Sequence, residues 1–416
     1  MNAEPPYTGD SWLSSDRSVP RLIARPVLTF LHTEAAGGMV LLAATLVALV
    51  WANSPFAESY RTLWHTEASV SMGSFELAHD LRHWVNEGLM TIFFFVVALE
   101  IKRELVVGEL NDPRKAALPV VAAFGGMVVP AAIYALLNWA GPGASGWGIP
   151  MATDIAFALG VLALLGDRIP SGLKVFLLSL AIVDDVGAIL VIALFYSAGI
   201  DLQWVALAAF VVGIVALLKK MDVKSIPVFV FLGFVMWVGM LESGVHATIA
   251  GVVLGLMTPA IPTGDNGTSV AEWLVSRLHP WTSFIVIPLF ALANAGLSVS
   301  LELFGAAARS PVTLGIVGGL VLGKVIGIAG ASWLAMRLKL VARPEGMSAH
   351  ELLGASALAG IGFTVSLFIA SLAFTSDELQ DAAKVGIFLA SAIAGAAGIL
   401  ILRADRGDEE DIAESS

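Results

Sequence analysis

Two adjacent carboxylates, Asp184 and Asp185, stand in the middle of residues 173–197, a stretch that is otherwise almost wholly apolar. The stretch is long enough to cross a bilayer, which takes about 20 residues. A charge at this depth is costly, so acids inside membrane helices are rare and are functional candidates. Because neighbouring residues on a helix point about 100° apart, one carboxylate can face an aqueous cavity while the other faces a partner inside the bundle.

Composition places the chain among membrane proteins. Hydrophobic residues make up 57% of the sequence and charged residues only 14%, whereas soluble domains average about 25% charged residues. The chain has no cysteine, which excludes disulfides, thiolate metal sites and thiol nucleophiles. We therefore predict an all-α polytopic membrane protein, with membrane lipid around it, no cofactor and no nucleic-acid partner.

The apolar segments predict twelve transmembrane helices. They form a domain over residues 28–402, between an N-terminal segment (1–27) and an acidic tail (403–416). The candidate spans are 35–51, 86–101, 116–138, 149–166, 174–197, 203–218, 226–241, 246–258, 281–298, 311–335, 350–373 and 382–402.

The distribution of Lys and Arg predicts the orientation. Eighteen of the 23 fall at the two termini and on one set of alternate loops; four fall on the other set and Lys324 lies inside a span. The four are Arg61, Arg82, Arg309 and Lys384. Since cytoplasmic loops carry the excess of basic residues, we expect both termini in the cytoplasm.

Three spans place an ionisable group near the middle of the membrane. Asp154 precedes the polar loop 167–171 by the same length of chain that separates this loop from Asp184. At about 1.5 Å per residue, both aspartates reach about 20 Å from the same face. Lys324 lies midway between Pro311 and Arg337, so we expect it at the same level.

Two spans carry helix-breaking residues at corresponding places. Thr153 and Asp154 follow Gly148 and Pro150 in the fourth span, and Gly360, Gly362 and Thr364 interrupt the eleventh. Each is the second span of a three-span block, 116–197 or 311–402, and the blocks begin on opposite sides. Paired interruptions of this kind indicate inverted repeats and a transporter site at the midplane.

Broken helices would leave helix ends facing each other at the midplane. Helix N-termini carry partial positive charge and C-termini partial negative charge. Asp154 is placed to offset the first and Lys324 the second; the alternative is that Asp154 is itself a cation ligand. Oxygen ligands suit a hard cation, and Asp184, Asp185, Thr153 and unwound carbonyls would supply them.

The same carboxylates can bind either a cation or protons, which is enough for exchange. Two carboxylates allow more than one proton per monovalent cation, and so a current. We assign Asp185 to the cation, because an exchanging residue must be reachable from water. We assign Asp184 to a charge pair with Lys324.

Several motifs together resemble those of NhaA-type sodium/proton antiporters, from about residue 25 to residue 402. They are Phe94–Leu105, Met151–Phe157, Ala181–Gly187, Gly244–Ala247, His279–Trp281, Gly323-Lys324 and Gly360–Thr364.

The resemblance assigns roles residue by residue. It implies that Asp184 and Asp185 bind Na+ and protons, that Thr153 and Asp154 form the unwound crossing, and that Lys324 is the lysine of the tenth helix. It also implies electrogenic, pH-regulated expulsion of Na+ or Li+ in exchange for H+, rising at alkaline pH.

The resemblance further assigns Glu100, Arg103 and Glu104 to a pH-response cluster at the cytoplasmic mouth. Their i, i+3 and i, i+4 spacing at a helix end equally fits an ordinary ion-pair group. We interpret His246 and His279, which lie at span ends, as structural or interfacial.

Residues 65–79 alternate in polarity on either side of Gly73-Ser74. This pattern fits an external β-hairpin, or an ordinary amphipathic loop. With the family resemblance it suggests a homodimer formed through the hairpin.

Three other functions compete. An intramembrane protease would need a nucleophile at depth, but Ser145 lies in a Pro/Gly loop, and Asp184 and Asp185 diverge on one helix. A sodium-coupled symporter of an organic solute on the same fold stays the main alternative; it would need a larger cavity. A channel would not need the pairing of Lys324 with an aspartate.

Overall fold

The computed structural model describes residues 34–72, 75–165, 169–197, 199–223, 225–261, 268–341 and 347–404. The predicted N-terminal segment 1–27, the hairpin turn at Gly73-Ser74 and the tail from residue 405 lie outside the described residues.

The described chain is almost entirely helical. Its α-helices are α2 (Glu34–Ala52), α3 (Ala57–Trp64), α4 (Leu81–His83), α5 (Met90–Val106), α6 (Pro113–Asn138), α7 (Ile155–Leu165), α8 (Ser171–Phe195), α9 (Leu202–Lys220), α10 (Ile226–Glu242), α11 (Thr248–Met257), α12 (Val270–Trp281), α13 (Ile287–Asn294), α14 (Leu301–Ala307), α15 (Pro311–Val317), α16 (Lys324–Arg337), α17 (Ala349–Leu358), α18 (Phe363–Ala373) and α19 (Asp377–Ala404).

Shorter segments with other helical geometry adjoin them. They are the 3-10 helices η4 (Glu109–Asn111) and η5 (Ala144–Met151), and the π-helices η3 (Trp84–Leu89), η7 (Thr282–Val286) and η8 (Gly318–Gly323). Strands β1 (Glu67–Met72) and β2 (Phe75–Asp80) pair antiparallel, with Glu67 opposite Asp80. They overlap the predicted hairpin range 65–79 and extend one residue beyond it, to Asp80. We call that side of the bundle the hairpin side.

Many of these helices are suited to a membrane. Within the described ranges, seven are long and apolar enough to cross one, or nine if each of two bent pairs counts as one span. Two shorter apolar helices, α10 and α11, add to them. The predicted all-α polytopic fold is confirmed, whereas the count of twelve spans stays a prediction.

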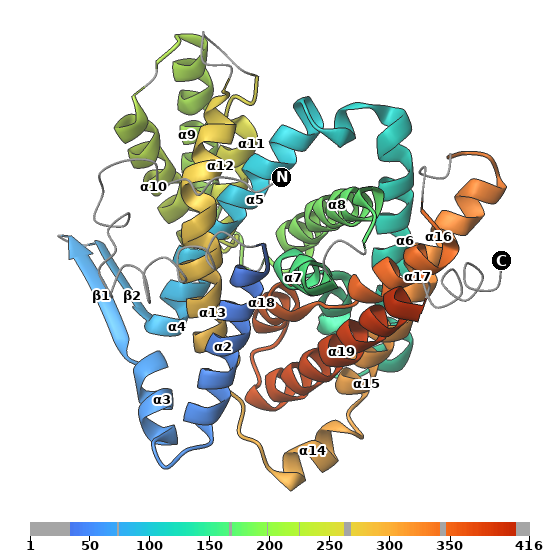
Figure 1. Cartoon of the computed structure of the whole chain (residues 1–416). Coiled ribbons are helices and arrows are strands. Elements are labelled where there is room, and N and C mark those ends of the chain that lie inside the picture. Colours follow the sequence, from blue (N-terminus) through green and yellow to red (C-terminus); the bar gives the residue numbers. More distant parts are fainter. Residues whose placement is uncertain are drawn as a thin grey trace, which may run out of the picture.

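Figure 1 shows the helices in two groups. Helices α9, α10, α11 and α12 stand on one side with α5, while α6, α8, α15, α16, α17 and α19 stand on the other. Within the groups, α5 packs on α11 and α6 packs on α16. The second group contains both three-span blocks predicted from the sequence.

Each block has a break in its second span, at the residues predicted. Helix geometry stops at Met151 and resumes at Ile155, and in the other block it stops at Leu358 and resumes at Phe363, with a 44° bend. The first half-span is a 3-10 helix rather than an α-helix. Pro150 lies inside it and lacks a donor N–H.

The two breaks contact each other directly. The Asp154 amide donates to the Ile361 carbonyl at 2.6 Å, and the Ser366 hydroxyl donates to the Ile149 carbonyl at 2.8 Å. Gly360 is needed here, because a Cβ at this position would lie 2.3 Å from the Leu320 carbonyl oxygen. The crossing therefore also contacts η8, the segment directly before Lys324.

Close backbone packing positions the helix that carries Lys324. A Cβ on Gly125 of α6 would lie 2.2 Å from the Gly327 carbonyl oxygen of α16, so the two backbones touch. The π-helix η8 ends at Gly323, directly before Lys324. π-helical turns occur often at functional sites, and this one rotates the residues that follow it.

Candidate functional site

Asp184 and Asp185 lie in the unbroken helix α8 and are both buried. Asp184 is 1% exposed and Asp185 is 7% exposed. The helix runs through its whole length without a Pro, so the offset of about 100° between the two side chains holds. The pair thus presents its carboxylates to different surroundings.

Lys324 joins Asp184 to the first break. Its Nζ lies 2.7 Å from Oδ2 of Asp184 and donates to the Thr153 hydroxyl at 3.0 Å. That hydroxyl donates to the Ala359 carbonyl of the second break at 2.8 Å. One continuous chain of hydrogen bonds therefore links α8, α16 and the two crossing segments.

Some oxygen atoms of the pair are left without partners. Oδ1 of Asp184 is buried, and no described group donates a hydrogen bond to it. Asp185 also accepts no hydrogen bond within the described residues. Buried polar atoms are nearly always paired, so the unpaired Oδ1 of Asp184 is a candidate ligand position beside Asp185.

Asp154 is fully occupied by the two broken helices. Its Oδ1 accepts from the Phe157 amide at 3.0 Å. Its Oδ2 accepts from the Thr364 amide at 3.0 Å and from the Thr364 hydroxyl at 2.5 Å. Asp154 therefore caps α7 and α18 together and balances the partial positive charge of both N-termini.

The electrostatics of the site follow from this geometry. The Lys324 charge pairs with Asp184 and also acts favourably on an ionised Asp185, whereas the charges of Asp184, Asp154 and Glu100 act unfavourably on it. A second positive charge beside Asp185 would relieve this repulsion. A monovalent cation and a proton can both supply that charge.

The donor set suits a hard cation rather than a resident transition metal. No group of three or more His, Asp or Glu side chains in the described residues is arranged to hold a metal ion. What the crossing offers is two carboxylates, the Thr153 hydroxyl and unwound backbone carbonyls. Oxygen ligands of this kind bind alkali and alkaline-earth cations.

The predicted pH-response cluster is only partly assembled. Arg103 pairs with its neighbour Glu104 at 3.4 Å, rather than across a helical turn with Glu100. Glu104 also accepts from the Glu109 amide at 3.0 Å, so it closes the end of α5. Glu100 is half-buried and makes no ion pair with Arg103, although the charges of Arg103 and Glu104 act on it and its own charge acts on Asp185.

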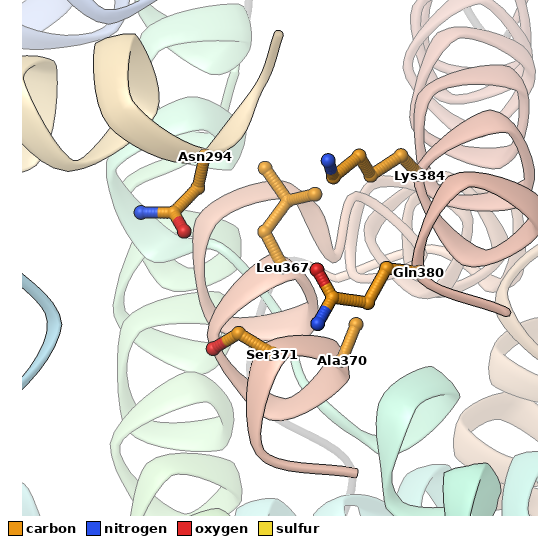
Figure 2. Close-up of a pocket in the computed structure, with 6 residues that line it drawn as sticks. All are labelled: Asn294, Leu367, Ala370, Ser371, Gln380 and Lys384. Carbon is orange, nitrogen blue, oxygen red and sulfur yellow. The ribbon is translucent and has the colours of Figure 1, made fainter. Parts of the chain in front are cut away.

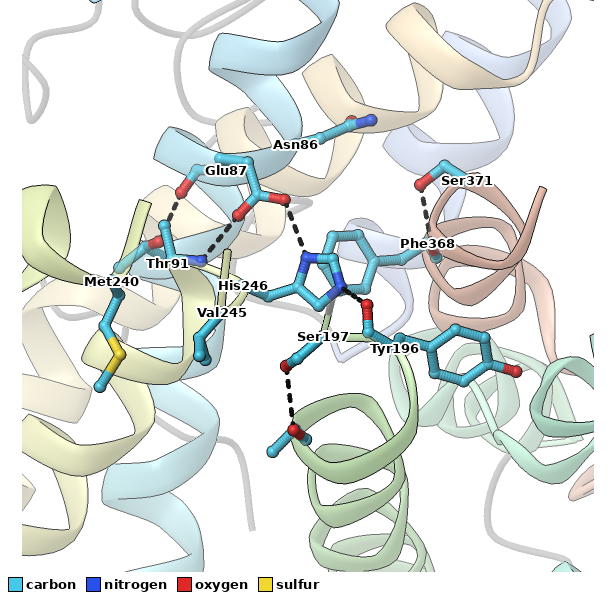
Figure 3. A network of polar contacts seen from close by, with 12 residues as sticks. Asn86, Glu87, Thr91, Tyr196, Ser197, Met240, Val245, His246, Phe368 and Ser371 are labelled. Atoms are coloured by element: carbon cyan, nitrogen blue, oxygen red, sulfur yellow. Dashed lines mark hydrogen bonds and ion pairs between the residues drawn. The ribbon is translucent and has the colours of Figure 1, made fainter. Parts of the chain in front are cut away.

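A second buried acid, Glu87 in η3, was not singled out by the sequence analysis. Its carboxylate accepts from the Ala247 amide at 2.9 Å and lies 3.4 Å from Nδ1 of His246. Nε2 of His246 donates to the Tyr196 carbonyl at 2.8 Å, next to the end of α8 (Figure 3). A lone acid inside the apolar run 84–99 was the available signal.

The sequence analysis assigned Lys384 to a loop, but the structure places it in a helix. It lies inside α19, two turns after the helix begins, and is 9% exposed. An apolar run beginning at residue 382 suggested a span start beside it, but polar residues extend the helix back to Asp377.

The sequence of the chain is similar to those of known proteins. The family described as Na+/H+ antiporter 1 matches residues 28–402. The Na(+)/H(+) antiporter NhaA of Rhodopirellula baltica is 45% identical over 416 residues, covering 91% of this chain and 93% of the relative. The Na(+)/H(+) antiporter NhaA 1 of Clostridium beijerinckii is 46% identical over 387 residues, covering 92% and 96%.

Proposed function

This chain belongs to the Na+/H+ antiporter 1 family, and from that premise we propose that it exchanges Na+ for H+ at the Asp184–Asp185 pair. As a member of this family it is a secondary transporter and not an enzyme. The unpaired Oδ1 of Asp184 beside Asp185, with Lys324 already on Oδ2, is the observation that carries the proposal.

In the proposed cycle, protons and sodium compete for the same oxygens. Without sodium, Asp185 holds a proton and protonated Lys324 holds Asp184. Sodium binds to Asp185, to Oδ1 of Asp184 and to oxygens of the crossing, and it displaces the proton of Asp185. It also competes with Lys324 for Asp184, so Lys324 releases a second proton.

This cycle is electrogenic. Two protons leave the site for each sodium ion that binds, so one net charge moves per turnover in the opposite direction to sodium. Alternating access arises when the two blocks that form the crossing move together against the remaining helices. Such a motion is typical of inverted-repeat transporters. The negative cell interior then draws protons in and drives sodium out.

Further parts of the proposal concern the surroundings. We place the chain in a bacterial inner membrane because of the family to which it belongs. We place both termini in the cytoplasm because of the asymmetry of Lys and Arg. Li+ shares the charge and hard character of Na+ and is a second substrate. The charge of Glu100 couples the cytoplasmic end of α5 to Asp185. The hairpin of β1 and β2 joins two copies of the chain in a homodimer.

The test is sodium-induced proton release from everted membrane vesicles, with no other solute added. Addition of Na+ or Li+ should release protons from acidified vesicles that contain the protein, but not from vesicles that contain the Asp184→Asn/Asp185→Asn double variant. A requirement for an added organic solute would favour the symporter instead.

A further inference from the structure

A second polar cluster lies between the crossing and the hairpin side, and the proposed cycle does not use it. Asn294, Ser371, Gln380 and Lys384 surround a small cavity together with Leu367 and Ala370 (Figure 2). The cavity volume is about 10 Å³, which is close to the least that holds one water molecule. Nothing as large as a hydrated sodium ion passes through it in this conformation.

The cavity lies beside α18, farther along this helix from the crossing. Thr364, which donates to Asp154, and Ser371 are two helical turns apart on this helix, about 10 Å at about 1.5 Å per residue. α18 runs from the break toward the hairpin side. A route from that side to the crossing along α18 therefore passes this cluster.

The cluster also lies at a boundary between two parts of the fold. Ser371, Gln380 and Lys384 belong to the block 311–402, whereas Asn294 ends α13, which lies outside both blocks. Lys384 closes the boundary, because its Nζ donates to the Gly296 carbonyl at 3.2 Å. If the block 311–402 moves relative to α13, the hydrogen bond between Lys384 and Gly296 must break.

The loop that presents the Gly296 carbonyl is held by hydrogen bonds to Tyr60 and Asn53. The Tyr60 hydroxyl accepts from the Gly296 amide at 3.1 Å and donates to the Leu292 carbonyl at 2.8 Å. Asn53 holds the next residues of the loop, with bonds to Leu297 and Val299. Hydrogen bonds therefore tie the loop to Asn53 and Tyr60, while Leu297 also packs in a buried apolar cluster with Val385 of α19.

Charged groups of both signs surround Lys384 at this boundary. Asp381 is the carboxylate that contacts Lys384, at 3.4 Å on the same helix. Arg82 acts electrostatically on Lys384 as well, and its buried Nε has no hydrogen-bond partner among the described residues. Asp377 also acts electrostatically on Lys384, so two carboxylates offset the two cations.

We propose that Lys384 is the outer gate of the ion pathway, where its ammonium group bridges the block 311–402 to the Gly296 carbonyl and closes the route to sodium arriving from the hairpin side. The inference rests on the proposed sodium–proton exchange and adds a residue that controls access from one side. Opening toward the hairpin side breaks the Lys384–Gly296 bond and lets water and sodium enter beside Ser371.

The first test measures access to Ser371. The chain has no cysteine, so Ser371→Cys provides a single thiol for a membrane-impermeant maleimide. Ser71→Cys, on an exposed position of the hairpin, is the control. We expect slow labelling of Ser371→Cys with Lys384 present and at least a tenfold rise with Lys384→Met, while labelling of Ser71→Cys stays constant.

A second variant leaves the lysine in place. Tyr60→Phe loosens the loop that presents the Gly296 carbonyl, and it should also speed the labelling of Ser371→Cys, by a smaller factor. This variant decides the matter if Lys384→Met does not insert. Labelling of Ser371→Cys as fast as Ser71→Cys with Lys384 present, or no rise in the variants, overturns the proposal.

The third test distinguishes a gate from a contact that only stabilises the fold. In oriented proteoliposomes, Lys384→Met should lower the KM for Na+ at the hairpin side at least threefold and leave the KM at the opposite side unchanged, and Lys384→Arg should behave as the parent. Equal changes at both sides, or none at either, overturn the gate. Absence of any sodium–proton exchange by the parent protein overturns the proposed function instead, and the labelling result still stands.

Discussion

Lys324 and Asp184 form an ion pair with a separation of 2.7 Å, and both side chains are completely buried. They come from α16 and α8, one in each three-span block, 140 residues apart in the sequence. The pair is thus the direct charge contact between the two blocks at the level of the crossing. Its energetics can be measured apart from transport.

A double-mutant cycle on this pair should show strong coupling. Breaking a buried ion pair by removing one partner costs roughly 3–5 kcal/mol, because the other charge stays buried without compensation. Asp184→Asn and Lys324→Gln should therefore each lower the thermal unfolding temperature in detergent, and the double variant should recover much of the loss. Additive effects of the two substitutions would contradict the pairing.

The two aspartates should differ in how they affect sodium binding. Asp185→Asn removes the carboxylate assigned to the cation, and loss of a buried charge partner typically costs about 3 kcal/mol, or roughly 100-fold in affinity. Asp184→Asn should weaken sodium binding less and reduce the transport current more. Calorimetry and current recording in proteoliposomes measure the two quantities.

The outcome that would overturn this assignment is specific for each variant. Wild-type sodium affinity in Asp185→Asn would show that the cation binds elsewhere. Full current in Asp184→Asn would show that this carboxylate has no part in proton movement. Ser179→Ala, at a buried polar position of the same helix, is the control for general damage to α8.

Exchange should increase as the pH rises. Protons compete with sodium for the carboxylates, so a fall in pH lowers the apparent sodium affinity, by roughly tenfold per pH unit for each competing proton. The KM for Na+ should fall with rising pH and become constant once the carboxylates are deprotonated. A KM that is the same at mildly acid and alkaline pH would be inconsistent with competition at one site.

Asp154 should matter more for the stability of the crossing than for ion binding. Asp154→Asn replaces one of the two acceptor oxygens with an NH2 group, which cannot accept, so the donors of either Phe157 or Thr364 lose their acceptor. An unsatisfied buried donor costs about 1–3 kcal/mol, so the unfolding temperature should drop. Residual sodium binding should persist at near-normal affinity; a complete loss of binding in a folded variant would make Asp154 a ligand.

The hairpin should be needed for assembly and not for exchange. Deleting residues 65–79 removes β1 and most of β2 but leaves the crossing unaltered. We expect the mass measured by light scattering in detergent to fall from that of a dimer to that of a monomer, with sodium–proton exchange still present. An unchanged mass would mean that two copies associate through another surface.

The membrane fold and the level of the charged residues could be read from the sequence because both follow from local rules. A long apolar run forms a helix in lipid, and the constant rise of a helix along its axis then places Asp154, Asp184 and Lys324 near one level. Gly360, Gly362 and Pro150 marked the breaks, because glycine and proline weaken a helix wherever they stand. None of these inferences needs to know which helices are neighbours.

Only the tertiary structure decided which groups meet. It brought Lys324 to Asp184 and Thr153, gave both oxygens of Asp154 to the two helix N-termini, and left Oδ1 of Asp184 unpaired. In the structure Arg103 pairs with Glu104 and not with Glu100, the partner suggested by the spacing. Glu87 and Lys384 are buried. The physical reason is that a buried charge is stabilised by partners from other helices, and their positions depend on backbone packing such as that of Gly125 against Gly327.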